Sequence, residues 1–169
     1  ICYERFRCVP DYSVIQACGL DILCVGGGVS IDRLARQRED ARYLRKETAS
    51  YWADEMPVFD EDKIKEISDY CLIDTVVTHT APSFCPLLDK NGLRSWAASD
   101  PQLLVDCDME RITMDRIYQT LKENGHPVNK WYYGHFHQKW TWKYEDTYFK
   151  MRDIMEFATV RTINYEDDD

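Results

Sequence analysis

The sequence predicts a single α+β domain, because helical and strand patterns alternate along it and its composition supports a hydrophobic core. The chain has 169 residues, which is enough for one domain with a real core. Hydrophobic residues make up 44% of it and charged residues 30%, the proportions of an ordinary globular protein. We expect one domain over residues 1–165 and a solvated acidic tail, E-D-D-D, over residues 166–169.

A β-hairpin is expected near the start of the chain. Residues 12–17 and 20–25 have strand character and are separated by a Cys-Gly turn. Three glycines follow at residues 26–28 without the spacing of a P-loop or a dinucleotide-binding loop, so we predict a tight, closely packed turn. The charged stretch over residues 30–51 is predicted to be a solvated loop or a short helix.

A helix with a favourable N-cap is predicted to begin after Asp60. Ile64 and Ile67 recur at helical spacing and are expected to be buried. The β-branched run over residues 74–78 then predicts a strand, which ends at His79. Strand ends are where α/β folds place their chemistry, so this histidine is a candidate site residue.

A second helix is predicted over residues 108–124, with Gly125 as its C-terminal stop. The residues expected on its buried face are Met109, Ile112, Ile117 and Leu121. Residues 83–106, before this helix, are expected to be irregular apart from one short helical turn.

Aromatic strands are predicted after the second helix. Residues 129–133 form one strand, residues 138–144 and 147–152 form a hairpin, and a last strand runs over residues 157–163. Four aromatic residues alternate with polar ones here, and we interpret them as packing residues rather than a nucleic-acid stacking platform: Trp131, Tyr132, Trp140 and Trp142.

Charge and cysteine content limit the function classes. The formal net charge of −9 argues against a general nucleic-acid or membrane-surface binder, although bound metal ions would still permit a phosphate-bearing substrate. No apolar run approaches the ~20 residues of a membrane span. The seven cysteines form no Cys-x-x-Cys pair, so we expect buried thiols and a cytoplasmic protein, with a zinc–thiolate or disulfide framework as the alternative.

Three histidines stand at the ends of predicted strands. His79 follows one strand, and His135 and His137 follow another directly after Gly134. In an extended backbone, side chains at positions i and i+2 point the same way, so His135 and His137 are expected to reach one point or two neighbouring points. Because neutral imidazole is the commonest metal ligand in proteins, the three histidines predict a metal site.

Two motifs resemble a known family. V-V-T-H-T-A-P at residues 76–82 and Y-G-H-F-H at residues 133–137 resemble the last two motifs of the calcineurin-like metallophosphoesterases. V-G-G-G-V-S-I-D-R at residues 25–33, followed by S-Y-W-A-D-E at residues 50–55, resembles a bacterial branch of that family. The resemblance covers roughly residues 10–160 of the chain.

The resemblance implies a four-layer α/β/β/α sandwich and the hydrolysis of a phosphate ester. His79, His135 and His137 would be ligands to two divalent metal ions, such as manganese, iron or zinc. Two ions held ~3.5–4 Å apart activate a water molecule and hold the phosphoryl oxygens of a phosphorylated substrate.

The family's first three motifs, Asp-x-His, Gly-Asp and Gly-Asn-His, are absent from this sequence. The resemblance therefore implies the C-terminal half of such an enzyme, with the leaving-group histidine encoded upstream of Ile1. Two cations repel each other when no bridging carboxylate compensates their charge. We therefore expect this chain alone to bind a two-metal centre weakly. Half a sandwich is also expected to associate, either with its N-terminal half or with itself.

Alternatives remain for both residues and function. Asp32 and Arg33 either face the site or form a surface salt link, and Tyr51 and Trp52 either form a substrate wall or pack in the core. His126 is expected to be a loop residue. The alternative to an enzyme is a non-catalytic binding or assembly module that keeps the fold, and a third possibility is a structural mononuclear zinc site.

Overall fold

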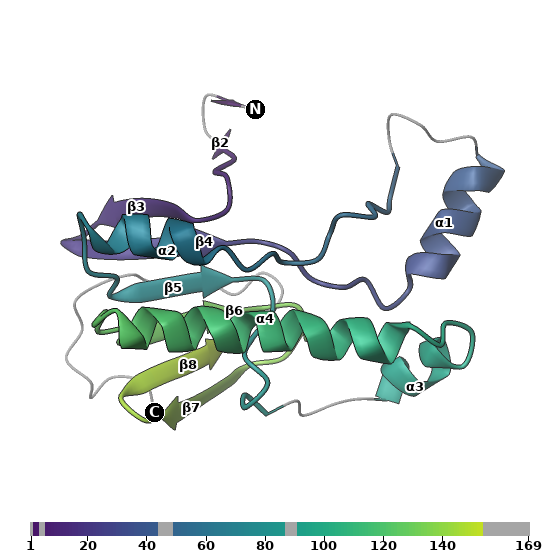
Figure 1. Cartoon of the computed structure of the whole chain (residues 1–169). Helices are drawn as coiled ribbons and strands as arrows, with labels where there is room; N and C mark the ends of the chain where they lie inside the picture. The colour runs from purple at the N-terminus through teal and green to yellow at the C-terminus, as the bar shows by residue number, and fades with distance from the viewer. Residues whose placement is uncertain (1, 4–5, 44–48, 87–90, 154–169) are drawn as a thin grey trace.

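The computed structural model describes residues 2–3, 6–43, 49–86 and 91–153, and a six-stranded mixed sheet lies at its centre (Figure 1). The strands follow the order β3-β4-β5-β6-β8-β7. Their bounds are β3 (Ser13–Ala17), β4 (Leu20–Val25), β5 (Thr75–Thr78), β6 (Lys130–Tyr133), β7 (Trp140–Tyr144) and β8 (Thr147–Met151). A separate two-stranded sheet pairs β1 (Cys2–Tyr3) with β2 (Phe6–Arg7).

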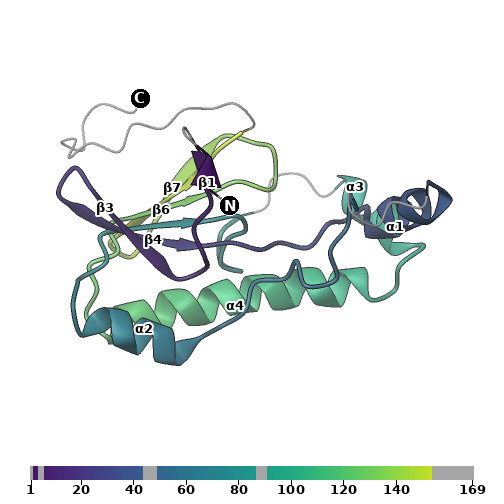
Figure 2. The ribbon, with the colours of Figure 1, turned by 90° about the horizontal axis from the view of Figure 1, so that it is seen from above.

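The helices of the described residues are α1 (Arg33–Arg42), α2 (Glu61–Ser68), α3 (Asn91–Ala97) and α4 (Leu103–Glu123). The predicted mixture of helices and strands is therefore confirmed. Helix α2 connects β4 to β5, and α3 and α4 connect β5 to β6, as crossovers between parallel strands require. Both α2 and α4 lie on the same face of the sheet (Figure 2), whereas α1 stands at one end of the molecule (Figure 1).

The two predicted hairpins are confirmed, because β3 pairs antiparallel with β4 and β7 pairs antiparallel with β8. Between them, β4, β5, β6 and β8 run parallel to one another. The carboxyl ends of these four strands therefore share one edge of the sheet. Ligand sites of parallel sheets lie at this edge, and both histidine motifs follow strands that end there.

The predicted start of α2 is confirmed. The Asp60 side chain accepts a hydrogen bond from the backbone N–H of Lys63, which satisfies one of the free amide groups at the start of the helix. Ile64 and Ile67 are buried against the sheet. Burial of two such side chains supplies a few kcal/mol, which holds this short helix in place.

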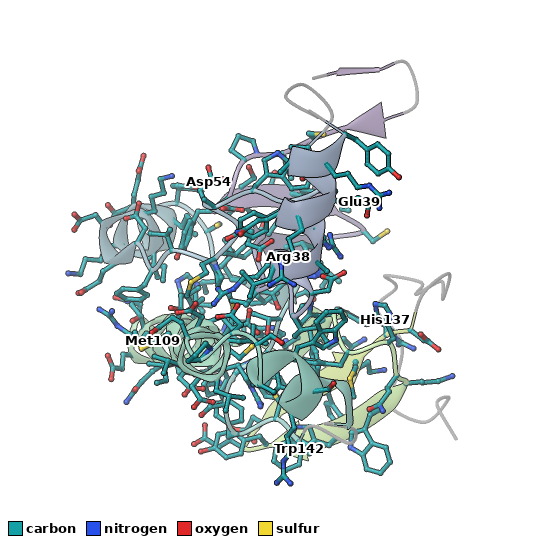
Figure 3. The ribbon with its side chains drawn as sticks, turned by 90° about the vertical axis from the view of Figure 1, so that its right-hand side faces the viewer. Arg38, Glu39, Asp54, Met109, His137 and Trp142 are labelled. Carbon is teal, nitrogen blue, oxygen red and sulfur yellow. The ribbon has the colours of Figure 1, made fainter. Side chains whose placement is uncertain are left out.

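The predicted buried face of α4 is wrong for two of its four residues. Met109 is 48% exposed and Ile112 is 43% exposed, and Figure 3 shows Met109 on the outer side of the helix. The residues of α4 that are buried are Leu103, Glu110, Met114, Ile117, Tyr118 and Leu121. These recur at spacings of three, four and seven, so the apolar stripe of the helix passes through an acidic residue that the hydrophobic pattern concealed.

The aromatic strand residues pack as predicted on β6 but not at the end of β7. Trp131 is fully buried and its indole Nε1 donates to Thr78 Oγ1 at 2.8 Å, while Tyr132 is 9% exposed. On the edge strand β7, Trp142 is partly buried, whereas Trp140, the first residue of the strand, is 44% exposed. The sheet and the helices therefore enclose an aromatic core centred on β6.

Three expectations concern less regular segments. Helix α1 confirms that the charged stretch after the glycines contains a short helix. The expectation of irregular structure over residues 83–106 is wrong in part, because α3 and the beginning of α4 lie there. The expected last strand over residues 157–163 and the acidic tail lie outside the described residues.

Six cysteines in the described part of the chain are free thiols, and they differ in how deeply they are buried. Cys85 is buried, and burial raises the pKa of its thiol to about 12. Cys8 and Cys18 are exposed, so the expectation of buried thiols is wrong for these two. In the part of the chain that the structure describes, we find no helix with the length and apolar character needed to cross a membrane.

Candidate functional site

Three segments lie together at the carboxyl edge of the sheet. They are the glycine turn after β4, His79 after β5 and the Gly134–His137 turn after β6. The parallel register pairs Val25 with Thr78 and Val77 with Tyr132, so the three strands end side by side. The backbone N–H of Gly134 donates to the carbonyl oxygen of His79 at 3.1 Å. The two histidine motifs are therefore joined directly through the backbone.

The side chains of His79 and His135 contact each other across these two strand ends. Nδ1 of His135 lies 2.9 Å from Nε2 of His79, and the ring centroids are 4.6 Å apart with an interplanar angle of 62°. At this distance one ring nitrogen donates a proton and the other accepts it. The contact therefore joins side chains from the two histidine motifs, and their role as metal ligands stays a prediction.

The backbone at His135 and His137 is not extended, so the expected geometry of two side chains pointing the same way is wrong. Strand β6 ends at Tyr133, and His135 and His137 have φ angles of 67° and 51°. The N–H of Phe136 donates to the carbonyl oxygen of Gly134 at 2.8 Å, which makes a tight turn. Left-handed φ at a residue with a Cβ costs on the order of 1 kcal/mol, and such strain is concentrated at functional sites.

This turn separates the environments of the two histidines. His135 is partly buried beside His79, whereas His137 is exposed and lies at the outside of the molecule (Figure 3). His137 is nevertheless close enough to influence both of the other rings electrostatically. The three histidines therefore form one group in which His135 occupies the inner position.

The inner two histidines favour the neutral form. Burial, together with the smaller effects of the neighbouring His79 and His137, lowers the pKa of His135 to about 4. Partial burial of the ring and the nearby His137 lower the pKa of His79, while Glu55 acts in the opposite direction. Both imidazoles are therefore uncharged at neutral pH, which is the form that binds a metal ion.

Glu110 of α4 forms the floor of the site. It is 1% exposed, its Oε2 accepts from the N–H of Val29 at 2.5 Å, and its Oε1 accepts from Thr80 Oγ1 at 3.1 Å. The same Oε1 lies 3.9 Å from Nε2 of His135. Burial raises the pKa of Glu110 to about 7, and the hydrogen bonds from Val29 and Thr80 oppose this change.

Our sequence reasoning missed Glu110 because it lies within a charged stretch of a helix. A signal was nevertheless present, since Glu110 lies four residues before Met114 and seven before Ile117, both fully buried. A carboxylate on the apolar stripe of a helix needs buried partners, and this position could have been singled out on that basis.

A second acidic residue, Glu55, holds the glycine turn. Its carboxylate accepts from the N–H of Ser30 at 2.6 Å and from Ser30 Oγ at 2.8 Å, and its carbonyl oxygen accepts from the N–H of Gly28 at 2.8 Å. Gly27 has a φ of 90°, and a Cβ there would lie 2.6 Å from the backbone nitrogen of Pro57. The predicted tight, closely packed glycine turn is confirmed.

The other sequence candidates have partners of their own. Arg33 binds Asp100 and Asp106 with nitrogen–oxygen distances of 2.6 Å each, and Asp32 binds Arg36 at 2.7 Å, as the salt-link alternative expected. Their role in a substrate site, and that of Tyr51 and Trp52, stays a prediction. Tyr51 is partly buried, whereas Trp52 is 60% exposed and is not a core residue.

His126 lies in the loop after α4, as expected, but it is buried and structural. Its Nδ1 accepts from the N–H of Ile73 at 2.9 Å, and its Nε2 lies 2.8 Å from Ser68 Oγ. These two contacts connect the end of α2, the start of β5 and the exit of α4. Both ring nitrogens are therefore occupied, which leaves none for a metal ion.

The histidine nitrogens fit one metal ion better than two. Two nitrogens bound at about 2.1 Å to one tetrahedral ion stand about 3.4 Å apart. Nδ1 of His135 and Nε2 of His79 lie 2.9 Å apart, so both fit the same ion with little movement. Glu55 and Glu110 use their oxygens in the hydrogen bonds above, and no group of three or more His, Cys, Asp or Glu side chains in the described ranges is arranged to enclose an ion.

Comparison with known proteins does not indicate a function for this chain. No protein-family model matches the chain, and no curated protein matches it either. The features of the chain that point to a function are the histidine contact, the buried carboxylate beside it and the edge of the sheet at which they lie.

Proposed function

We propose that this chain provides the histidine side of the metal site of a metal-dependent phosphoesterase. His79, His135 and His137 are the metal ligands in this proposal. The observation that carries it is the 2.9 Å contact between His135 Nδ1 and His79 Nε2, two neutral imidazoles brought together from motifs 56 residues apart. A bound divalent ion would lower the pKa of a water molecule and polarise a phosphoryl oxygen, which are the two requirements of phosphoester hydrolysis.

The residues of this chain have distinct roles in the proposed site. His79 and His135 bind one ion from the inner side, and the exposed His137 faces outwards, where a second ion or the substrate arrives. The glycine turn brings the backbone close to the His79 ring without a side chain between them. The acidic chain does not repel an anionic substrate from this edge, because the bound cation reverses the local field.

We further propose that the sheet with α2 and α4 on one face is half of a four-layer sandwich. Ile15 and Val77 lie on the opposite face by the strand register, and they are 41% and 39% exposed. Exposed apolar side chains on a sheet face favour a covering layer. An N-terminal half of the enzyme or a second copy of the chain would supply that layer.

Metal binding by the purified chain tests the proposal. Isothermal titration with Zn²⁺ or Mn²⁺ is expected to show one bound ion, and His79→Ala and His135→Ala are each expected to weaken binding more than tenfold. Gln16→Ala, at an exposed position of the edge strand β3, is the control and should bind as the parent chain does. Unchanged affinity in both histidine variants would overturn the metal site.

The reaction itself requires carboxylate ligands that the described residues do not offer. Hydrolysis of p-nitrophenyl phosphate is therefore expected from a chain extended through the upstream reading frame, provided that this frame encodes Asp-x-His, Gly-Asp and Gly-Asn-His. His135→Ala should abolish this turnover. A start codon directly upstream and no turnover in any form would exclude the phosphoesterase.

One observation favours a second candidate, a non-catalytic binding or assembly module that keeps the fold. Glu55 acts electrostatically on His79 and Glu110 faces His135, and both carboxylates are engaged with Ser30, Val29 and Thr80. Such a module would bind one structural zinc ion and raise its Tm with zinc, yet hydrolyse no phosphate ester in any extended form. Zinc stabilisation without turnover would therefore favour this candidate.

A further inference from the structure

We propose that Glu110 is a positioning residue, which holds the His135 ring so that Nδ1 presents its lone pair beside Nε2 of His79. The inference rests on the proposed metal site and adds a residue to it. No histidine motif contains Glu110, since it reaches the site from α4 through the interior of the domain.

The two ring nitrogens of His135 face different neighbours. Nδ1 lies 2.9 Å from His79 Nε2, whereas Nε2 lies 3.9 Å from Glu110 Oε1. The second distance exceeds that of a hydrogen bond by roughly 1 Å, which a small rotation of the ring can close. A metal-bound histidine usually donates its other ring N–H to a carboxylate or carbonyl oxygen. In His135, Nδ1 would bind the metal ion and Nε2 would donate to the Glu110 carboxylate.

Glu110 is held rigidly enough to orient a neighbour. Its Oε2 accepts from the N–H of Val29, which follows the glycine turn, and its Oε1 accepts from the hydroxyl of Thr80, which follows His79. One buried carboxylate therefore contacts the segments after β4 and β5 and faces the segment after β6. Because it projects from a 21-residue helix, its position does not depend on a loop.

A carboxylate has a property here that an amide of the same size lacks. It accepts hydrogen bonds on both oxygens, so it can accept from Val29 and Thr80 and, after a small rotation of the ring, from the Nε2–H of His135 as well. In Glu110→Gln, the single amide oxygen is taken by the N–H of Val29, and the NH₂ group faces His135. A donor opposite Nε2 favours the other tautomer of His135, with the proton on Nδ1, where it blocks a metal ion.

The tautomer can be measured in the metal-free chain. Long-range ¹⁵N–¹H NMR of the imidazoles at mildly alkaline pH, where Glu110 is ionised, is expected to show His135 with its proton on Nε2, with resonances assigned through single histidine variants. Glu110→Gln is expected to move this proton to Nδ1. Glu123→Gln, the same change at an exposed position of α4, is the control and should leave the tautomer unchanged.

The result in the parent chain does not depend on the folding of Glu110→Gln and is decisive for the proposal. A His135 proton on Nδ1 in the parent chain would overturn the proposal, and so would an unchanged tautomer in folded Glu110→Gln. Circular dichroism of each variant establishes folding before the comparison.

Metal affinity provides the second readout. At mildly alkaline pH, Glu110→Gln is expected to weaken Zn²⁺ binding about 10–100-fold, the usual effect of losing the partner of a ligating histidine. Glu123→Gln should bind as the parent chain does. Equal affinity of Glu110→Gln and the parent chain would refute the role of Glu110 but leave the metal site intact. Absence of Zn²⁺ binding in the parent chain would refute the metal site, while the tautomer measurement would still decide the role of Glu110.

Discussion

Gly28 and His79 are packed so closely that any side chain at position 28 would have to displace the His79 ring. A Cβ added to Gly28 would lie 2.5 Å from Cδ2 of the His79 ring, well inside van der Waals distance. The glycine turn after β4 and the histidine after β5 therefore form a single packed unit. Gly28, the third of the three glycines, leaves room for the His79 ring beside the candidate metal site. This explains one of the three glycines in the run.

Gly28→Ala is expected to displace the His79 ring and to break its contact with His135. The backbone at this glycine is not left-handed, so the substitution acts through the ring rather than through strain. We expect Zn²⁺ affinity to fall about tenfold or more, with little change in Tm. Gly134→Ala is the matched control, because its Cβ would meet only the carbonyl oxygen of Arg152 at 3.8 Å. Equal losses in both variants would contradict this explanation.

Glu110 is expected to make the fold less stable as the pH rises. The pKa of Glu110 is about 7 in the folded chain and near its ordinary value of 4.5 in the unfolded chain, so the folded state binds more protons between these values. Its stabilising contribution is complete below the unfolded pKa and is lost as the pH rises through the folded pKa. The loss amounts to roughly 3 kcal/mol at most.

Urea unfolding at acidic and mildly alkaline pH measures this contribution. Other acidic groups also titrate, so the relevant quantity is the difference between the parent chain and Glu110→Gln at each pH. The groups that act on Glu110 besides its hydrogen-bond donors are Arg111, which lowers its pKa, and Glu55, which raises it. A difference that does not change with pH would show that Glu110 keeps an ordinary pKa.

The buried face of α4 can be tested with two methionines five residues apart. Met114 is fully buried, so Met114→Ala should lower the free energy of unfolding by about 2–5 kcal/mol. Met109 is 48% exposed, so Met109→Ala should change it by less than about 0.5 kcal/mol. Urea denaturation of both variants compares the two faces of one helix. Comparable losses would restore the face expected from the sequence.

Arg33 is expected to support the fold and to be dispensable for metal binding. Its guanidinium binds Asp100 and Asp106, and the Asp100 contact lowers the pKa of that carboxyl group. Arg33→Ala should speed hydrogen exchange in α1, because it removes the link between this helix and the start of α4. Zn²⁺ affinity should stay within about twofold of the parent chain, since the two regions share no partner. A tenfold loss of affinity would instead place Arg33 in the site.

The sequence by itself determined the elements whose signals are local. Asp60 caps α2 with its own side chain, the Cys-Gly turn joins β3 to β4, and His79 follows the last β-branched residue of β5. Each of these depends on residues a few positions apart in the chain. The sequence also predicted that each histidine motif follows a strand, whereas the parallel pairing of β5 with β6 that brings His79 to His135 is a finding of the structure.

Only the tertiary structure decided which groups lie beneath and around the histidines. Glu110 reaches His135 because the face of α4 that carries Glu110 packs towards the sheet. The packing of the whole core determines which face of the helix is buried. The tight turn at His135 and His137 replaced the expected extended chain, because β6 ends at Tyr133 and the backbone then bends to bond with His79. Local patterns specify which elements form, whereas a buried carboxylate and a strained turn are stabilised by partners far away in the sequence.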